Sequence, residues 1–245
     1  VISLKSRYTG QASKVALGMW SAGQMMFNKY LLLTPESTVV RDSENIASLL
    51  RNCSPKHSVI RSEGIYDVLD HATASCGYGG KMAIDLTGVT DNSAQPTIGQ
   101  IVLPEDVTMS KALVDKWSTL LLFADSATTV DLEQIANQAE VNCKFITLFD
   151  SRAEGFEGED LLWLAAANTD PSRDIALVGN KLTVDARIKI PGEAKNPARF
   201  PNVVTSTPDI IEAVDKRWEE YGIGEFIASP SLKYRKLIFN NKAEW

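Results

Sequence analysis

Two pairs of short segments that share one pattern decide the fold of this chain: Lys29-Tyr30-Leu31-Leu32-Leu33 with Lys81-Met82-Ala83-Ile84-Asp85, and Lys144-Phe145-Ile146-Thr147-Leu148 with Lys181-Leu182-Thr183-Val184-Asp185. The first segment of each pair is a lysine followed by an aromatic and apolar run typical of a buried strand. A helical stretch follows, and the second segment is an apolar strand that begins with Lys and ends with Asp. A unit used twice predicts two related αβ lobes from an internal duplication.

The remaining pattern predicts an α/β protein with mixed sheets flanked by helices, because strands alternate with helices along the chain. Apolar residues at helical spacing predict a helix over Gln11–Trp20. The segment 91–105 is rich in Asp, Asn, Ser, Gln, Pro and Thr, which is typical of a linker. We therefore expect a first lobe at 1–90, a linker at 91–105, a second lobe at 106–228 and an extended tail at 229–245.

Composition limits the class of protein. The net charge of −6 in 245 residues argues against a broad nucleic-acid-binding face. The three cysteines are widely spaced and form no CxxC pair, which argues against a disulfide scaffold or a zinc site and fits a reducing cytoplasm. No apolar run approaches the roughly 18 residues of a membrane span. We expect a cytoplasmic protein without a membrane span or a nucleic-acid partner.

Several motifs of the first lobe resemble, in order, the C-terminal region of the UbiD family of decarboxylases. The matching segments are Ser3–Ala12, Asn28-Lys29-Tyr30, Tyr66-Asp67-Val68-Leu69-Asp70-His71-Ala72 and Gly77–Asp85. The second lobe resembles the same region again, in Asp160–Ala165, Asp170-Pro171-Ser172-Arg173-Asp174 and Glu212–Gly222. The second lobe lacks the Leu-Asp-His segment, and the first lacks the Asp-Pro-x-Arg-Asp turn.

The resemblance implies a non-oxidative carboxy-lyase that acts on an aromatic or α,β-unsaturated carboxylic acid with prenylated FMN. It also implies a place in ubiquinone or menaquinone biosynthesis and a homo-oligomer. In that family the ligands of the flavin and its divalent metal, and the catalytic Arg and Glu residues, lie upstream of the matched region. The chain starts without Met, so we expect an N-terminal region of the same enzyme as its partner. We expect no catalytic residue and no metal ligand in this chain, which would be inactive alone.

The resemblance points to Lys29 as a ligand of the flavin phosphate, since an ammonium group offers three donors to a phosphate. The alternative is a lysine that extends from a strand edge to solvent. Ile65, Tyr66, Leu69 and His71 are candidates for the substrate pocket, the first three as an apolar wall and His71 as a polar contact. For His71 the alternative is a hydrogen bond that holds its own loop.

Two broader alternatives remain open. The glycine-rich segment Gly77–Lys81 could cradle an anion with its backbone N–H groups, although a tight turn before a strand explains it as well. The whole chain could also be a non-catalytic structural or oligomerisation module, whose duplicated lobes only make subunit contacts. The second lobe favours this alternative, because it lacks the segment expected to face the pocket.

Overall fold

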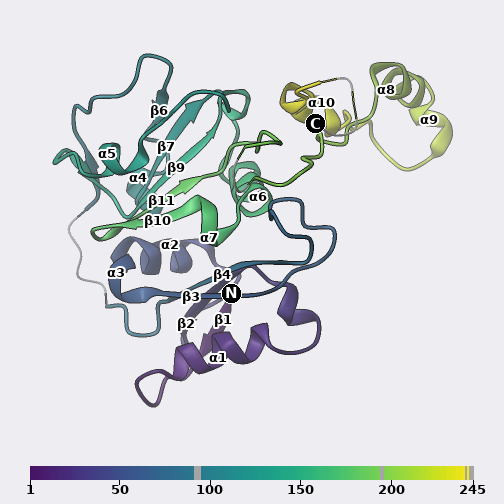
Figure 1. The fold of residues 1–245 in the computed structure, drawn as a ribbon. Coiled ribbons are helices and arrows are strands. Elements are labelled where there is room, and N and C mark those ends of the chain that lie inside the picture. Colours follow the sequence, from purple (N-terminus) through teal and green to yellow (C-terminus); the bar gives the residue numbers. More distant parts are fainter. Residues whose placement is uncertain (91–94, 194–195, 241, 243–245) are drawn as a thin grey trace. The chain divides into compact units, whose positions relative to one another are not determined.

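The computed structural model describes every residue except 91–94, 194–195, 241 and 243–245 (Figure 1). The chain divides into two compact units, Val1–Ala198 and Arg199–Trp245. The first unit is α/β, with mixed sheets flanked by helices, as the strand and helix patterns predict. In the described part of the chain, no helix is long and apolar enough to cross a membrane.

The first lobe is built on a four-stranded sheet in the order β1-β2-β4-β3. Strands β1, β2 and β4 run parallel, and β3 is antiparallel to β4. The elements of this lobe are β1 (Ile2–Leu4), α1 (Gln11–Trp20), η1 (Gly23–Phe27), β2 (Tyr30–Pro35), α2 (Ser43–Asn52), α3 (Pro55–Ser58), β3 (Val59–Ile65) and β4 (Tyr78–Asp85).

Helix α1 has the predicted limits and buries the predicted face. Ala12, Ala16 and Trp20 are buried against Leu31 and Leu33 of β2, so the helix covers one side of the first sheet (Figure 1). Helix α2 begins after Asp42, whose carboxylate accepts hydrogen bonds from two amides of the first turn.

The second lobe is built on a five-stranded sheet in the order β10-β11-β9-β7-β6, beside a two-stranded sheet of β5 and β8. Strands β7, β9 and β11 run parallel, and β10 is antiparallel to β11. The elements are β5 (Thr97–Ile98), β6 (Thr108–Ser110), α4 (Val114–Trp117), β7 (Thr119–Ala124), α5 (Leu132–Ala136), β8 (Val141–Asn142), β9 (Phe145–Asp150), η2 (Ser151–Ala153), α6 (Gly158–Asn168), α7 (Pro171–Asp174), β10 (Ile175–Val178) and β11 (Lys181–Asp185).

The two quoted segment pairs are neighbouring parallel strands in the same register. Tyr30 pairs with Met82 in the first lobe, and Phe145 pairs with Leu182 in the second. Both pairs also end with the same hydrogen bond, donated by the amide that follows Asp85 or Asp185. The Leu86 amide donates to the Leu33 carbonyl, and the Ala186 amide donates to the Leu148 carbonyl, each at 2.8 Å. The two sheets thus share strand order, strand direction and register, while their origin in an internal duplication stays a prediction.

The predicted lobe limits also stay predictions. Residues 91–94 of the expected linker lie outside the described residues, and the rest of it includes β5, which pairs with β8 of the second lobe. The expected tail likewise lies partly outside them, at 241 and 243–245. The compact division falls after Ala198, within the expected second lobe.

Arg199–Trp245 is the second compact unit, and hydrogen bonds of Asn202 connect its first described residues to its last ones. The Asn202 side chain donates to the carbonyls of Asn240 at 2.8 Å and Lys242 at 3.0 Å. This unit holds α8 (Pro208–Asp215), α9 (Trp218–Tyr221), α10 (Ser231–Tyr234) and η3 (Arg235–Leu237).

Candidate functional site

Lys29 lies just before β2, where its ammonium group joins the two lobes. Its Nζ lies 2.8 Å from Oδ2 of Asp70, and both side chains are largely buried, with 10% and 17% exposed. The same Nζ donates to the carbonyl of Thr169 in the second lobe at 3.1 Å. Lys29 therefore has an internal counter-ion, and it fixes the 66–77 connection of the first lobe against the end of α6.

Tyr66 is buried beside the ammonium groups of Lys29 and Lys81. Its ring centroid lies 5.8 Å from Nζ of Lys29 and 4.5 Å from Nζ of Lys81, distances at which a cation is attracted to the ring face. The phenol donates to the carbonyl of Gly80. Burial raises the pKa of Tyr66, so the phenol stays protonated and keeps this donor.

Lys81 is fully buried in β4. Its ammonium group donates to three backbone carbonyls, those of Met26 at 2.6 Å, Asn28 at 2.9 Å and Ile65 at 2.7 Å. These bonds use all three donors of the group and join η1, the start of β2 and the end of β3. Burial lowers the pKa of Lys81 to about 8.

His71 lies in the same connection and contacts the second lobe. Burial lowers the pKa of His71, while Asp70 and a hydrogen bond with the Asn168 side chain act in the opposite direction. Asn168 in turn donates to the carbonyl of Ala186 at 3.1 Å. The sequence allows two roles for His71, a substrate contact and a hydrogen bond that holds its own loop. The hydrogen bond with Asn168 corresponds to the second role.

The other two substrate candidates lie away from this cluster. Ile65 is 50% exposed and Leu69 is 85% exposed, whereas Tyr66 between them is 1% exposed. The structure thus brings together Lys29, Tyr66 and His71, and it does not form a wall from the three apolar candidates.

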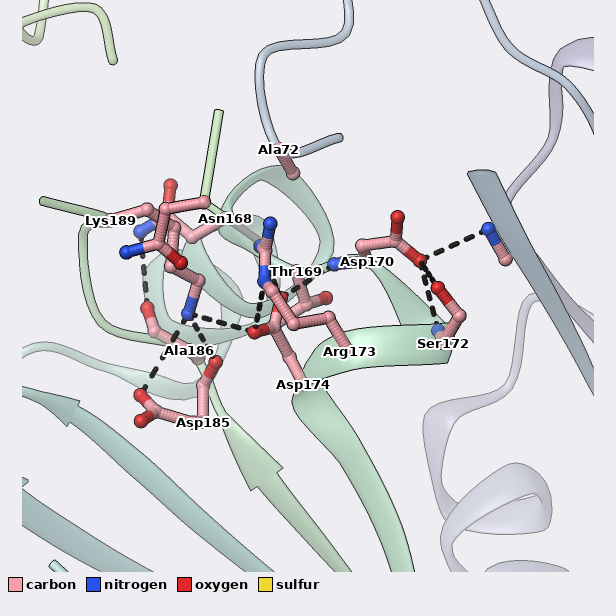
Figure 2. A network of polar contacts seen from close by, with 12 residues as sticks. Ala72, Asn168, Thr169, Asp170, Ser172, Arg173, Asp174, Asp185, Ala186 and Lys189 are labelled. Atoms are coloured by element: carbon pink, nitrogen blue, oxygen red, sulfur yellow. Dashed lines mark hydrogen bonds and ion pairs between the residues drawn. The ribbon is translucent and has the colours of Figure 1, made fainter. Parts of the chain in front are cut away.

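The second lobe contributes an acidic turn at the start of α7 (Figure 2). Oδ1 of Asp170 accepts from the amide and hydroxyl of Ser172, at 2.9 and 2.7 Å, and from the amide of Gly80 in the first lobe at 3.0 Å. The same carboxylate oxygen therefore caps α7 and accepts a hydrogen bond from β4 of the first lobe. The amide of Gly80 donates to this carboxylate, so the glycine-rich segment is a docking point for the second lobe in this structure.

Next to Asp170 lies a buried network of opposite charges, also drawn in Figure 2. Asp174 pairs with Arg173 at 2.6 Å and with Lys189 at 3.3 Å, and it accepts from the amide of Asp170 at 2.7 Å. Lys189 also donates to the carbonyl of Asp185 at 2.7 Å. The network holds the acidic turn against the end of β11, because breaking a buried charge pair is costly.

Close approach of the lobes depends on two glycines of β4. A Cβ at Gly80 would lie 2.8 Å from Oδ1 of Asp170, and even closer to the Ser172 amide nitrogen. A Cβ at Gly79 would lie 2.6 Å from Cγ2 of Thr73 and 2.9 Å from Oδ2 of Asp170. The sequence analysis did not predict this contact between β4 and the acidic turn. The Asp170–Asp174 motif and the adjacent glycines Gly79 and Gly80 were the features that could have indicated it.

Lys29, to which the resemblance points, does not fit a flavin phosphate in this arrangement, and neither does the glycine-rich segment with Lys81. Asp70 neutralises Lys29, three carbonyls enclose Lys81, and a carboxylate accepts from the Gly80 amide. Among the described residues, no group of three or more His, Cys, Asp or Glu side chains is placed to hold a metal ion. The cluster holds the two lobes together through the contacts of Lys29 with Asp70 and Thr169 and of Gly80 with Asp170, which we call the joint.

Comparison with known proteins finds a family match for the first lobe. Residues 1–86 match the family model described as 3-octaprenyl-4-hydroxybenzoate carboxy-lyase C-terminal domain, UbiD_C. An uncharacterized protein of Aquifex aeolicus is 39% identical over 87 residues, which are 35% of this chain and 18% of that protein. An uncharacterized protein of Helicobacter pylori is 24% identical over 233 residues, which are 87% of this chain and 37% of that protein. The chain thus spans less than two fifths of the length of these relatives.

Solved structures with partial likeness include two enzymes. For vanillic acid decarboxylase of Sedimentibacter hydroxybenzoicus, the TM-score is 0.34 at 10% identity, over 67% of this chain and 45% of that chain. For an evolved dimeric form of a UbiD-class enzyme from Pelotomaculum thermopropionicum, in complex with prFMN, it is 0.27 at 11% identity, over 54% and 40%. Residues 1–86 of this chain match the C-terminal domain of the UbiD family of carboxy-lyases.

Proposed function

We propose that this chain is the C-terminal part of a non-oxidative carboxy-lyase that acts on an aromatic or α,β-unsaturated acid with prenylated FMN. The observation that carries this proposal is the UbiD C-terminal domain in residues 1–86. Bound prenylated FMN would supply the electron sink for loss of carbon dioxide. The flavin and metal ligands and the reacting residues belong, in this proposal, to the upstream region of a protein of the relatives' length.

Within such an enzyme, this chain would act as a rigid scaffold for the reacting half. The joint of Lys29, Asp70 and Thr169 supports this role, because its charged groups are paired with each other. A phosphate role for Lys29 stays a proposal that requires Asp70 to move away. Contacts of Ile65, Tyr66, Leu69 and His71 with substrate likewise stay proposals, and exposure favours Leu69 and Ile65 as the residues that an added region would cover.

The experiment is an assay of a protein of the relatives' length that contains this chain. The protein would be loaded with prenylated FMN and given a panel of aromatic and α,β-unsaturated acids, 4-hydroxybenzoates with polyprenyl groups among them. We expect release of carbon dioxide from at least one acid and the reverse exchange of labelled bicarbonate into it. A loaded, folded protein that decarboxylates none of the acids and exchanges no label would contradict the proposal.

A second candidate function is a non-catalytic structural or oligomerisation module. The observation in its favour is that the charged groups of the Lys29 cluster and of the Asp174 network serve internal contacts. Under this candidate, the longer protein would fold and assemble but would neither retain the flavin nor exchange label. The same assay, read beside flavin content and molecular mass, separates the two candidates. The first proposal also includes a cytoplasmic location, a homo-oligomer and a place in quinone biosynthesis. These three properties are proposed only together with the carboxy-lyase activity.

A further inference from the structure

The two lobes repeat one order of elements. In the first lobe, β2 is followed by α2, the single turn α3, β3 and β4. In the second, β9 is followed by α6, the single turn α7, β10 and β11, with the short η2 inserted before α6. Both single turns have Pro as their first residue. The strand order β1-β2-β4-β3 of the first sheet recurs in the second as β7-β9-β11-β10.

Strand register assigns equivalent residues. Val59 pairs with Ile84 in the first lobe, and Ile175 pairs with Val184 in the second. Counting from these pairs, Ser54 before α3 is equivalent to Asp170 before α7. In the same way, Gly80 before Lys81 is equivalent to Asn180 before Lys181.

The contacts between the lobes connect these equivalent residues crosswise. The Ser54 hydroxyl and the Lys56 amide of the first lobe donate to Oδ1 of Asn180 in the second, at 2.8 and 3.0 Å. The Gly80 amide of the first lobe donates to Asp170 in the second at 3.0 Å. The Ser54 position of each lobe thus contacts the Gly80 position of the other.

The buried side chains between the lobes follow the same rule. One core cluster contains Met82 and Ile84 of β4 together with Leu182 of β11, and Val184 of β11 packs against it. Met82 is equivalent to Leu182, and Ile84 to Val184. The same positions of both central strands therefore line one shared core.

A contact in which residue i meets j of the partner while j meets i of the partner is isologous, and it requires a two-fold relation. We infer that the two lobes are related by a two-fold rotation and that each presents a self-complementary docking face whose partner is a lobe of the same topology. In this chain the second lobe occupies the docking face of the first. One polypeptide thereby contains the contact that two copies of a single lobe would make.

The test uses a geometric property of a two-fold. If positions i and j of one lobe have equivalents i′ and j′ in the other, the distance from i to j′ equals that from i′ to j only for a two-fold. Two exposed equivalent pairs are suitable: Ser43 with Glu159, at the starts of α2 and α6, and Lys56 with Ser172, in α3 and α7. Cysteines at these sites would carry nitroxide labels in the full chain, in which Cys76→Ser removes the exposed native thiol. Double electron–electron resonance would then measure the distances between the labels.

We expect the 43–172 and 159–56 distance distributions to have the same mean. The 43–56 and 159–172 pairs are the control, since they compare the lobes internally and do not depend on how the lobes are related. Matching control pairs with different cross pairs would overturn the two-fold. If a labelled variant does not fold, Glu36 and Ser151, equivalent positions that follow β2 and β9, replace the affected pair and give the same comparison.

Discussion

The two lobes share a sheet but differ in the segments that follow it. The first lobe has the long 66–77 connection between β3 and β4, whereas the second joins β10 to β11 through only two residues, Gly179 and Asn180. The second lobe instead has the acidic turn at Asp170–Asp174, where the first has a turn without Asp. The long connection of one lobe meets the acidic turn of the other, so the joint is a composite that neither lobe contains alone.

The largest expected difference concerns the equivalent lysines Lys81 and Lys181. Lys81 is fully buried with three carbonyl partners, whereas half-buried Lys181 donates to the Ala136 carbonyl. We expect Lys81→Met to lower the free energy of unfolding by about 3–5 kcal/mol, because several buried carbonyls lose their donor. Lys181→Met should cost about 1 kcal/mol. Urea unfolding of both variants is the measurement, and equal losses would contradict the comparison.

The next effect concerns the close approach of β4 to α7. Gly80→Ala should lower the free energy of unfolding by about 1–3 kcal/mol, because the new methyl group overlaps the backbone of Ser172 and the Asp170 carboxylate. Gly18→Ala in α1 is the matched control: its Cβ meets nothing within 4 Å, so it should stabilise by about 0.5–1 kcal/mol. Thermal unfolding distinguishes the two, and a neutral Gly80→Ala would remove the steric argument for the joint.

The buried ammonium group of Lys81 also predicts a pH dependence. Its pKa falls from 10.5 to about 8 in the folded state, so the unfolded chain holds this proton more tightly. Stability should therefore rise as pH rises through the window between these two values. The rise amounts to about 2 kcal/mol between about pH 7.5 and 9.5. Urea unfolding at both pH values measures this rise, with Lys81→Met as the control that lacks the group. If that variant does not fold, the measured rise is compared with the value of about 2 kcal/mol. A free energy of unfolding that falls over this window would contradict the prediction.

The smallest expected difference concerns the caps of the two single turns. Asp170→Ala removes an oxygen that accepts three hydrogen bonds, and should cost about 2 kcal/mol. Ser54→Ala removes one hydroxyl donor, while Asn180 still accepts from the Lys56 amide, and should cost about 0.5–1 kcal/mol. Chemical unfolding of both variants checks the order, and a larger loss for Ser54→Ala would contradict it.

The sequence predicted the fold where the pattern was local. Helix α1 lies where its apolar spacing places it, and β2 and β4 contain the predicted apolar runs. Strand β4 already begins at Tyr78, within the glycine-rich segment for which a tight turn was the alternative. The short strands β5, β6 and β8 were not predicted, because two or three residues leave no period to read.

The joint was only partly predictable. Lys29 and His71 were chosen as candidates, but the ion pair of Lys29 with Asp70 depends on how the first lobe folds, and the contact of His71 with Asn168 depends on how the lobes dock. Lysine is rarely buried, so nothing in the motif marked Lys81 as an enclosed ammonium group. Leu69 is apolar yet exposed, since apolar type alone does not fix burial. In each case the missing information was tertiary.

The most direct test of the account is flavin content beside thermal stability for Lys29→Ala, in a protein of the relatives' length loaded with prenylated FMN. Lys144→Ala, at the equivalent position of the second lobe, is the control. If Lys29 is a joint between lobes, its variant unfolds at a lower temperature than the control but retains as much flavin per folded molecule. Loss of flavin at an unchanged unfolding temperature would contradict the account and assign Lys29 to the cofactor phosphate.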